Sequence, residues 1–88
     1  MSDQQLIEKL KEDKSVLKQI YTKHKSYSVN YIRKMIFNEK QKEFAVDIYH
    51  DAVILFYNKV RKEEFELSSN IQTFIIGICR NRVLEFIK

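Results

Sequence analysis

The sequence of 88 residues contains no proline and a single glycine, Gly77. Proline and glycine form most tight turns and interrupt helices, so a chain almost free of both is poorly suited to a sheet with many hairpins. The chain is long enough for one hydrophobic core and too short for two. We therefore predict an all-α fold for residues 1–88: a compact bundle of three main helices, preceded by a short N-terminal helix.

Capping signals and polar segments place these helices along the chain. Ser2 and Gln5 fit a capping box, and so do Ser69 and Gln72. The segment "NEKQKE", residues 38–43, has no apolar residue and is expected to be a loop or a frayed helix start. The expected helices cover residues 3–12, 14–37, 43–61 and 70 to the end of the chain.

Apolar residues three or four positions apart predict the buried face of each main helix. For the second helix these are Leu17, Ile20, His24, Tyr27, Tyr31 and Met35. For the third helix they are Ala45, Ile48, Tyr49, Ala52, Phe56 and Val60. For the fourth helix they are Ile71, Phe74, Ile75, Ile78, Val83 and Phe86.

The composition argues against several classes of protein. One cysteine, Cys79, excludes an internal disulfide and a cysteine-based zinc site. No segment resembles a signal peptide or a membrane span, so we expect a cytoplasmic protein without a membrane partner. His24 and Cys79 lie on or beside apolar faces, and His50 has no companion at ligand spacing. We expect no enzymatic activity, no cofactor and no metal.

The net charge is +4, which is compatible with a phosphate-bearing partner and weak as a signal by itself. A more specific feature is an acidic row, Glu43, Asp47 and Asp51, spaced four apart on one face of the third helix. Acids near a helix N-terminus stabilise the helix dipole and keep that face hydrated. Alternatively, the row is a docking face for a basic protein surface, with Ile48 and Leu55 adding apolar contact.

The loop before the fourth helix also allows two interpretations. Phe65 and Leu67 either pack back onto the core, or join Ser68, Ser69 and Asn70 in a pocket for an unstacked base. In the helix that follows, the polar triplet 80–82 interrupts an apolar segment. We expect its asparagine to form a specific hydrogen bond, one arginine to bond within the fold, and the other to meet phosphate.

The apolar pattern is still running at Ile87 and Lys88, with no residue that closes a helix. We therefore expect the chain to be part of a longer protein.

Two segments together resemble region 2 of the extracytoplasmic-function sigma factors, within the sigma-70 family. The segments are "EFAVDIYHDAVILFYNKV" and "FELSSNIQTFIIGICRNRVLEFIK". The first carries "AVDIYH" where the family has Ala-Glu-Asp, two hydrophobic residues and Gln. The second carries "FIIGICRN" where the family has an aromatic residue, Leu-x-x-Ile-Ala-Arg-Asn. Val46 replaces the usual acid, His50 the usual glutamine, and Phe74 the more frequent tryptophan.

The resemblance implies a fold and a function. In the family, the acidic third helix docks on the coiled coil of the beta-prime subunit of core RNA polymerase. The loop and fourth helix recognise and melt the promoter minus-ten element and hold its single-stranded non-template strand. A second, promoter-binding domain follows in the family, and by this resemblance we expect it to be absent from these 88 residues. The family's frequent regulator, an anti-sigma factor, is also an expected partner.

By this resemblance, the residues of the two surfaces are as follows. Polymerase binding is assigned to Asp47, Ile48, Asp51 and Leu55, and DNA binding to Phe65, Ser68, Ser69, Asn70, Thr73, Phe74, Arg80 and Lys88. The acidic row and the loop are expected at adjacent places on one surface. The alternative is a helical protein-interaction module, sigma-like or anti-sigma-binding, that has no DNA-binding activity.

Overall fold

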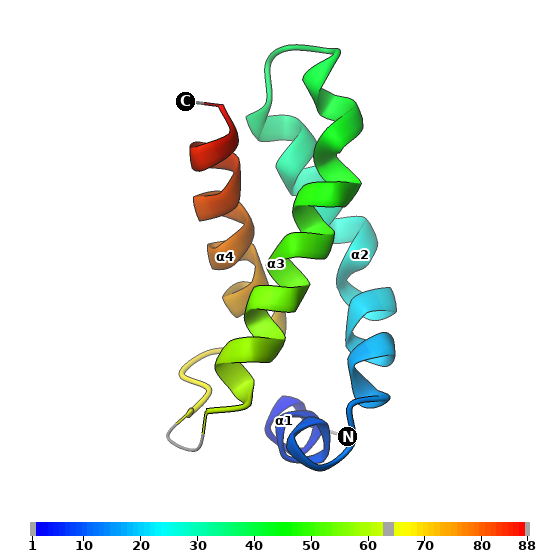
Figure 1. Ribbon diagram of the computed structural model, residues 1–88, viewed down its shortest axis with the longest axis vertical. Helices are drawn as coiled ribbons and strands as arrows, with labels where there is room; N and C mark the ends of the chain where they lie inside the picture. The colour runs from blue at the N-terminus through cyan, green and yellow to red at the C-terminus, as the bar shows by residue number, and fades with distance from the viewer. Residues whose placement is uncertain (1, 63–64, 88) are drawn as a thin grey trace.

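The computed structural model describes residues 2–62 and 65–87, and all regular structure in them is helical. The elements are α1 (Asp3–Glu12), α2 (Val16–Met35), the short 3₁₀ helix η1 (Gln41–Phe44), α3 (Ala45–Val60) and α4 (Ile71–Phe86). The three long helices run along a body of 39 × 22 × 19 Å, and α1 crosses one end of it (Figure 1). The predicted all-α bundle with a short leading helix is confirmed.

Local hydrogen bonds explain why two helices begin later than predicted. The Asp13 carboxylate accepts hydrogen bonds from the backbone N–H of Ser15 at 3.0 Å and from its hydroxyl at 2.8 Å. This turn keeps the chain out of the helix until Val16, two residues beyond the expected start. In the predicted loop, Asn38 accepts from the backbone of Lys40 at 2.9 Å, and η1 follows it. Helix α3 consequently begins at Ala45.

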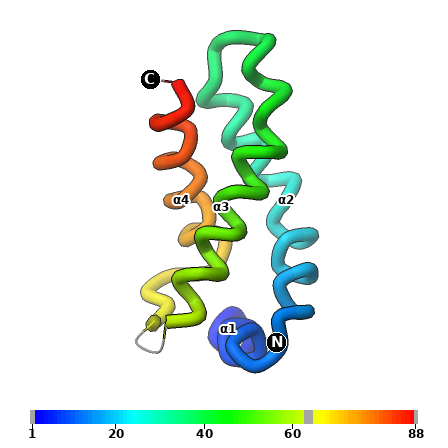
Figure 2. Tube along the Cα trace, in the orientation of Figure 1, coloured from blue at the N-terminus to red at the C-terminus, as the bar shows by residue number. Residues whose placement is uncertain are grey.

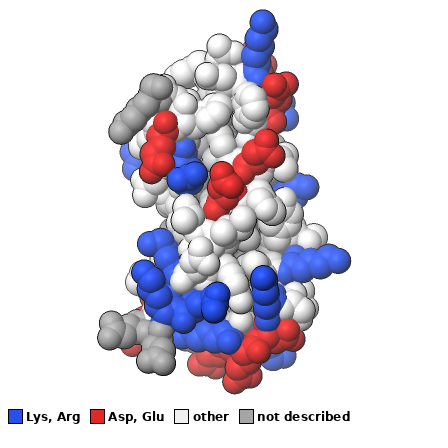
Figure 3. Space-filling view, in the orientation of Figure 1, with Lys and Arg blue, Asp and Glu red and all other residues white. Residues whose placement is uncertain are grey.

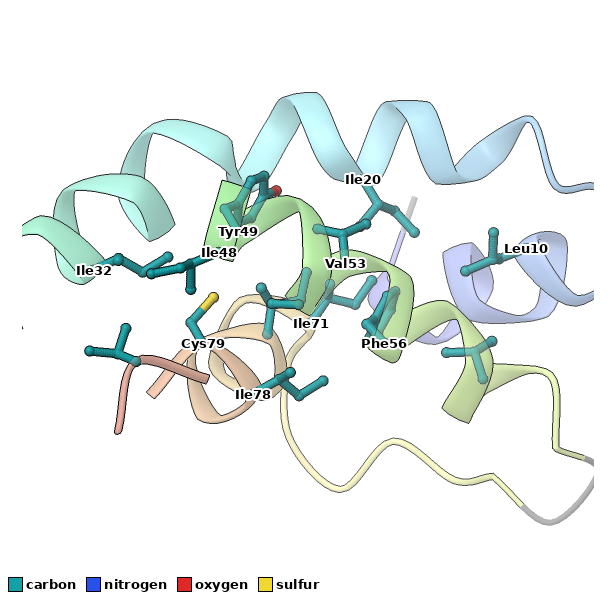
Figure 4. Close-up of a cluster of buried hydrophobic side chains, with 14 of the residues drawn as sticks. Leu10, Ile20, Ile32, Ile48, Tyr49, Val53, Phe56, Ile71, Ile78 and Cys79 are labelled. Carbon is teal, nitrogen blue, oxygen red and sulfur yellow. The ribbon is translucent and has the colours of Figure 1, made fainter. Parts of the chain in front are cut away.

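Helix α3 is the central helix, and its buried face was predicted correctly. All six expected residues of its apolar stripe are buried, together with Val53. Figure 4 shows these side chains between those of α2 on one side and α4 on the other. The Tyr49 hydroxyl, inside this core, donates a hydrogen bond to the backbone carbonyl of Tyr21 at 2.7 Å. The buried polar group of Tyr49 is thereby satisfied.

The buried face of α2 was predicted only in part. Ile20 and His24 are buried as expected, whereas Tyr27 is 63% exposed. The remaining buried positions are Val16, Ser28 and Ile32. Tyr31, Met35 and Leu17 are half-buried at the border. The prediction failed at Tyr27 because apolarity favoured the tyrosine ring, while the structure buries the neighbouring serine and satisfies its hydroxyl.

A buried polar chain joins α2 to α4 and accounts for Ser28. The Gln72 side-chain amide donates to the Ser28 hydroxyl at 3.0 Å, and Gln72 Oε1 lies 2.8 Å from His24 Nδ1. Because Oε1 can only accept, Nδ1 carries the hydrogen of this bond. His24 Nε2 is buried without a partner among the described residues.

These bonds also overturn the second predicted capping box. Ser69 does not cap α4, and Gln72 does not turn back to the helix start. Asn70 is the N-cap: its side-chain oxygen accepts from the backbone N–H of Thr73 at 2.7 Å. The tertiary contact with α2 takes the glutamine that a local capping box would have used.

Helix α4 buries Ile71, Ile75, Ile78 and Val83, as predicted. Its other buried residue is Cys79, and burial raises the pKa of the thiol to about 12. A thiol with so high a pKa stays protonated at neutral pH and packs as a small hydrophobic group. Phe86, expected on the apolar stripe, is exposed.

Helix α1 holds the chain segment that leads into α4. Its predicted capping box is confirmed. The backbone N–H of Gln5 donates to the Ser2 hydroxyl at 3.2 Å, and the backbone N–H of Ser2 donates to the side-chain oxygen of Gln5 at 2.9 Å. The Asp3 carboxylate also accepts from the backbone N–H of Ile71 at 2.8 Å. Lys11 donates to the Phe65 carbonyl at 3.4 Å. Thus α1 is hydrogen-bonded to both ends of the segment 65–71. This segment lies at the end of the body away from the C-terminal end of α4 (Figure 2).

Candidate functional site

The acidic row of the third helix is on the surface. Glu43, in η1, and Asp47 and Asp51, in α3, all have exposed side chains. Asp51 pairs with Arg82 of α4, with Arg82 Nη2 3.6 Å from its carboxylate, and Arg82 also binds Glu85 at 3.1 Å. Asp47 has no ion pair with a described residue. Glu43 has none either, so the row presents two unpaired carboxylates, at Glu43 and Asp47, and one partly neutralised carboxylate at Asp51.

The two apolar residues assigned to the same face differ in accessibility. Ile48 is only 7% exposed, and its side chain belongs to the core. It reaches the surface at the bottom of a shallow pocket between α3 and α4, beside Asp51, Arg82 and Phe86. Leu55 is half-buried and keeps part of its surface available. A partner at this face would touch Leu55 and the two aspartates more than Ile48.

The loop before α4 presents its polar residues to solvent. Ser68, Ser69 and Asn70 are exposed, and so is Thr73 in the first turn of the helix. The Asn70 side-chain oxygen is occupied by the cap on Thr73, which leaves its NH₂ group as a donor for a ligand. The Ser69 hydroxyl makes one long hydrogen bond, 3.4 Å, to the Asn70 carbonyl.

The two phenylalanines assigned to DNA binding pack against each other. Phe65 and Phe74 meet edge to face, with ring centroids 5.4 Å apart, and Phe74 makes a similar contact with the buried Phe56 at 5.9 Å. Both Phe65 and Phe74 are half-buried, and so is Leu67. The apolar residues of this loop therefore pack back onto the core, which is the first of the two interpretations. Its polar residues remain accessible to a ligand.

The outer face of α4 forms an exposed strip with helical spacing. It consists of Thr73, Gly77, Arg80, Asn81 and Leu84. A Cβ added at Gly77 would meet no atom within 4 Å, so the helix backbone is open there to a close approach. The sequence pattern had not singled out Gly77 as part of a site, although an isolated glycine in a helix was the available signal.

The polar triplet at residues 80–82 divides as expected for its arginines. Arg80 is exposed and forms no side-chain hydrogen bond or ion pair with a described residue. Arg82, in contrast, turns toward Asp51. The specific hydrogen bond expected for Asn81 is not found among residues 2–62 and 65–87. Asn81 points to solvent instead. Lys88, also assigned to DNA binding, lies outside the described residues.

The acidic row and the loop lie at opposite ends of α3, not at adjacent places. Asp47 is in the first turn of this helix, and the loop follows its last residue, Val60. At a rise of 1.5 Å per residue, these two positions are about 20 Å apart along the axis. Figure 1 shows α4 running between the two ends, with the loop at its start. Arg80 lies in the second half of this helix, Ile71–Phe86. The two surfaces can therefore be occupied at the same time.

Comparisons of the chain with protein-family models, curated proteins and solved structures find no match. Within the described residues, no three His, Cys, Asp or Glu side chains are grouped so that they could hold a metal ion. None of the described helices has the length and apolarity to cross a membrane.

Proposed function

We propose that this chain is a region 2-like domain of a sigma factor, which docks on core RNA polymerase and recognises and melts the promoter minus-ten element. One observation carries the proposal. The two segments that resemble the family lie on neighbouring antiparallel helices, α3 and α4, and on the loop between them. The described polar residues that the resemblance assigns to binding are all exposed there: Asp47, Asp51, Ser68, Ser69, Asn70, Thr73 and Arg80. The assigned apolar residues are less accessible, since Ile48 is buried and Leu55, Phe65 and Phe74 are half-buried.

The docking half of the proposal rests on Asp47. Its carboxylate is exposed, unpaired among the described residues, and close to the start of α3. A basic surface on the beta-prime coiled coil would meet it without first breaking an ion pair. At Asp51 the same partner would compete with Arg82, so this residue contributes less to affinity.

The DNA half rests on the loop and the outer face of α4. Extruding a base costs a few kcal/mol of stacking and pairing, which hydrogen bonds in a pocket must offset. Ser68, Ser69 and the amide of Asn70 are the accessible donors and acceptors for this role. From there the strip passes Gly77 to Arg80, where a strand could follow the helix with its phosphates toward the guanidinium. With a net charge of +4, the domain depends on the polymerase to bring DNA to it.

A first prediction tests base capture at the loop. Ser69→Ala and Asn70→Asp should each weaken binding of a single-stranded minus-ten oligonucleotide by holoenzyme, by about fivefold to tenfold, since each removes one hydrogen bond to the base. Asn70→Asp is preferred to Asn70→Ala because the carboxylate keeps the cap on Thr73 and lacks the NH₂ donor. Its negative charge also repels phosphate, which weakens binding in the same direction. Fluorescence anisotropy at fixed salt measures the affinity.

The matched control is Ser26→Ala, which changes an exposed serine on α2. It should bind the oligonucleotide as the native protein does. Unchanged affinity of both loop variants would place base capture elsewhere.

A second prediction separates stability from DNA contact at Gly77. Gly77→Ala should stabilise the domain by about 0.5–1 kcal/mol, because the added methyl group meets nothing and alanine favours the helix. If a strand passes close to the backbone here, Gly77→Trp should weaken oligonucleotide binding several-fold while the thermal midpoint stays close to that of the native chain. Full affinity of Gly77→Trp would remove Gly77 from the DNA path.

The alternative, a helical protein-interaction module without DNA binding, has one observation in its favour. The rings of Phe65 and Phe74 are engaged with each other and with the core, so less aromatic surface remains for stacking on bases. This alternative predicts polymerase binding that depends on Asp47, with no effect of the loop variants on any DNA complex.

A further inference from the structure

A groove between the first half of α2 and the middle of α3 is not used by the proposed function. Its floor is apolar and its α2 edge is cationic. The floor is formed by Leu17, Tyr21, Val53 and Ile54, and Lys14 and Lys18 stand along the edge. Ile54 is 45% exposed although it is a large aliphatic residue in the middle of a helix. Such a residue gains most from a partner that covers it.

The lysines at this groove, Lys14 and Lys18, have no ion-pair partner among the described residues, and no acidic residue lines the groove. The nearest acid in the chain, Asp13, is bonded to Ser15 at the edge of the groove. Beside the groove, the ring of Tyr57 has two cations over it, with Lys14 Nζ 5.7 Å and the Arg61 guanidinium 5.6 Å from its centroid. In Figure 3, Lys and Arg side chains gather over the lower half of the face, where α3 ends, and a cluster of Asp and Glu lies below them at the lower edge.

We propose that this groove binds an amphipathic helix of a partner protein, with an apolar stripe bordered by Asp and Glu. Side chains at positions i, i+3 or i+4, and i+7 of such a helix would cover Ile54, Val53 and Leu17. Its carboxylates would lie beside Lys14 and Lys18. A third helix laid against the antiparallel pair α2 and α3 would repeat the packing that α4 makes on the other side of α3.

The chemistry of the floor decides between this occupant and a nucleic acid. Lysines alone would serve phosphate equally well. Nucleic-acid bases, however, need hydrogen-bonding groups or a free aromatic face. The floor offers three aliphatic side chains, and the other lining groups are already engaged. The Tyr21 ring is in contact with Tyr49 at 4.9 Å, has Lys25 at 5.7 Å and meets the exposed His50 ring edge to face at 6.1 Å. The Ser15 hydroxyl donates to the Asp13 carboxylate at 2.8 Å. This surface therefore suits an apolar stripe with acidic borders. The proposal does not depend on the sigma-like function.

The test uses the native chain and a fluorescent peptide of about 18 residues, with leucines at helical spacing bordered by glutamates. Anisotropy should show binding that weakens as salt is raised, and a peptide with lysines in place of the glutamates should not bind. Ile54→Glu should weaken binding about tenfold or more, and Lys18→Glu about fivefold. Far-ultraviolet circular dichroism confirms that each variant is folded.

Two control variants introduce the same kinds of substitution, an aliphatic residue to Glu and a lysine to Glu, at positions outside the groove. Leu84→Glu replaces a residue of similar exposure on α4, and Lys34→Glu lies at the far end of α2. Both should bind the acidic peptide as the native chain does. The proposal is overturned if the acidic peptide does not bind, if the control variants lose as much affinity as the groove variants, or if a single-stranded oligonucleotide binds in its place with the same dependence on Ile54.

Discussion

Asp47→Arg is expected to weaken the retention of this chain by core RNA polymerase about 30-fold or more, which corresponds to about 2 kcal/mol. The substitution removes one of the two unpaired carboxylates of the acidic row and, in the proposed docking, sets a like charge against a basic coiled coil. The side chain is exposed, so the core is not disturbed. Near the start of α3, the exchange of an acid for a base also costs about 0.3–1 kcal/mol of stability. A pull-down or a surface-binding titration against core enzyme measures the effect.

The control must reproduce the charge change without touching this face. Glu8→Arg, on the exposed side of α1, changes the net charge by the same amount and should be retained as the native chain is. Asp51→Arg is a poorer test, because it would place an arginine against Arg82 and destabilise the α3–α4 contact as well. Equal retention of Asp47→Arg and Glu8→Arg would show that Asp47 is not at the docking surface.

Much of the fold could be predicted because local signals and packing agree. The capping box of Ser2 and Gln5 involves residues three apart, and the buried stripe of α3 follows from helical spacing alone. The failures occur where tertiary contacts decide. Ser28 is buried in place of Tyr27 because Gln72, 44 residues away, supplies a hydrogen-bond partner. No pattern within a single helix contains that information.

For the candidate site too, some features could be predicted from the sequence and others depend on helix packing. Exposure of Asp47, Asp51 and residues 68–70 agrees with the amphipathic patterns, since those positions lie off the apolar stripes. The pairing of Asp51 with Arg82 could not be read from the sequence, because it depends on how α4 lies against α3. The distance between the acidic row and the loop, by contrast, follows from the length of α3 and could have been predicted from the expected helix over residues 43–61. A surface shared by two helices is set by their packing, which periodicity does not specify.

Gln72→Ala is expected to lower the free energy of unfolding by about 2–4 kcal/mol. Two buried polar groups depend on this one side chain: the Ser28 hydroxyl and the His24 Nδ1–H. Each group that loses its partner away from water costs about 1–3 kcal/mol. A domain of this size has a total stability of roughly 4–13 kcal/mol, so the loss would be a large fraction of it. Urea unfolding followed by circular dichroism measures the change.

The matched control is Gln19→Ala, which removes an exposed glutamine from α2 and should change stability by no more than about 0.5 kcal/mol. A triple variant tests the physical reason. His24→Leu, Ser28→Ala and Gln72→Leu together leave no buried polar group without a partner, and they also remove the unpartnered His24 Nε2. Replacing all partners by apolar groups is close to neutral when none is left unsatisfied.

The triple variant should therefore be more stable than Gln72→Ala, although it contains more substitutions. If instead its loss equals the sum of three separate losses, the cost of Gln72→Ala would come from lost packing and not from stranded hydrogen-bonding groups. The contact between α2 and α4 would then owe its stability to apolar burial alone. The polar chain would serve only to fix the register of α4 against α2, and with it the position of the loop that α1 holds at the start of α4.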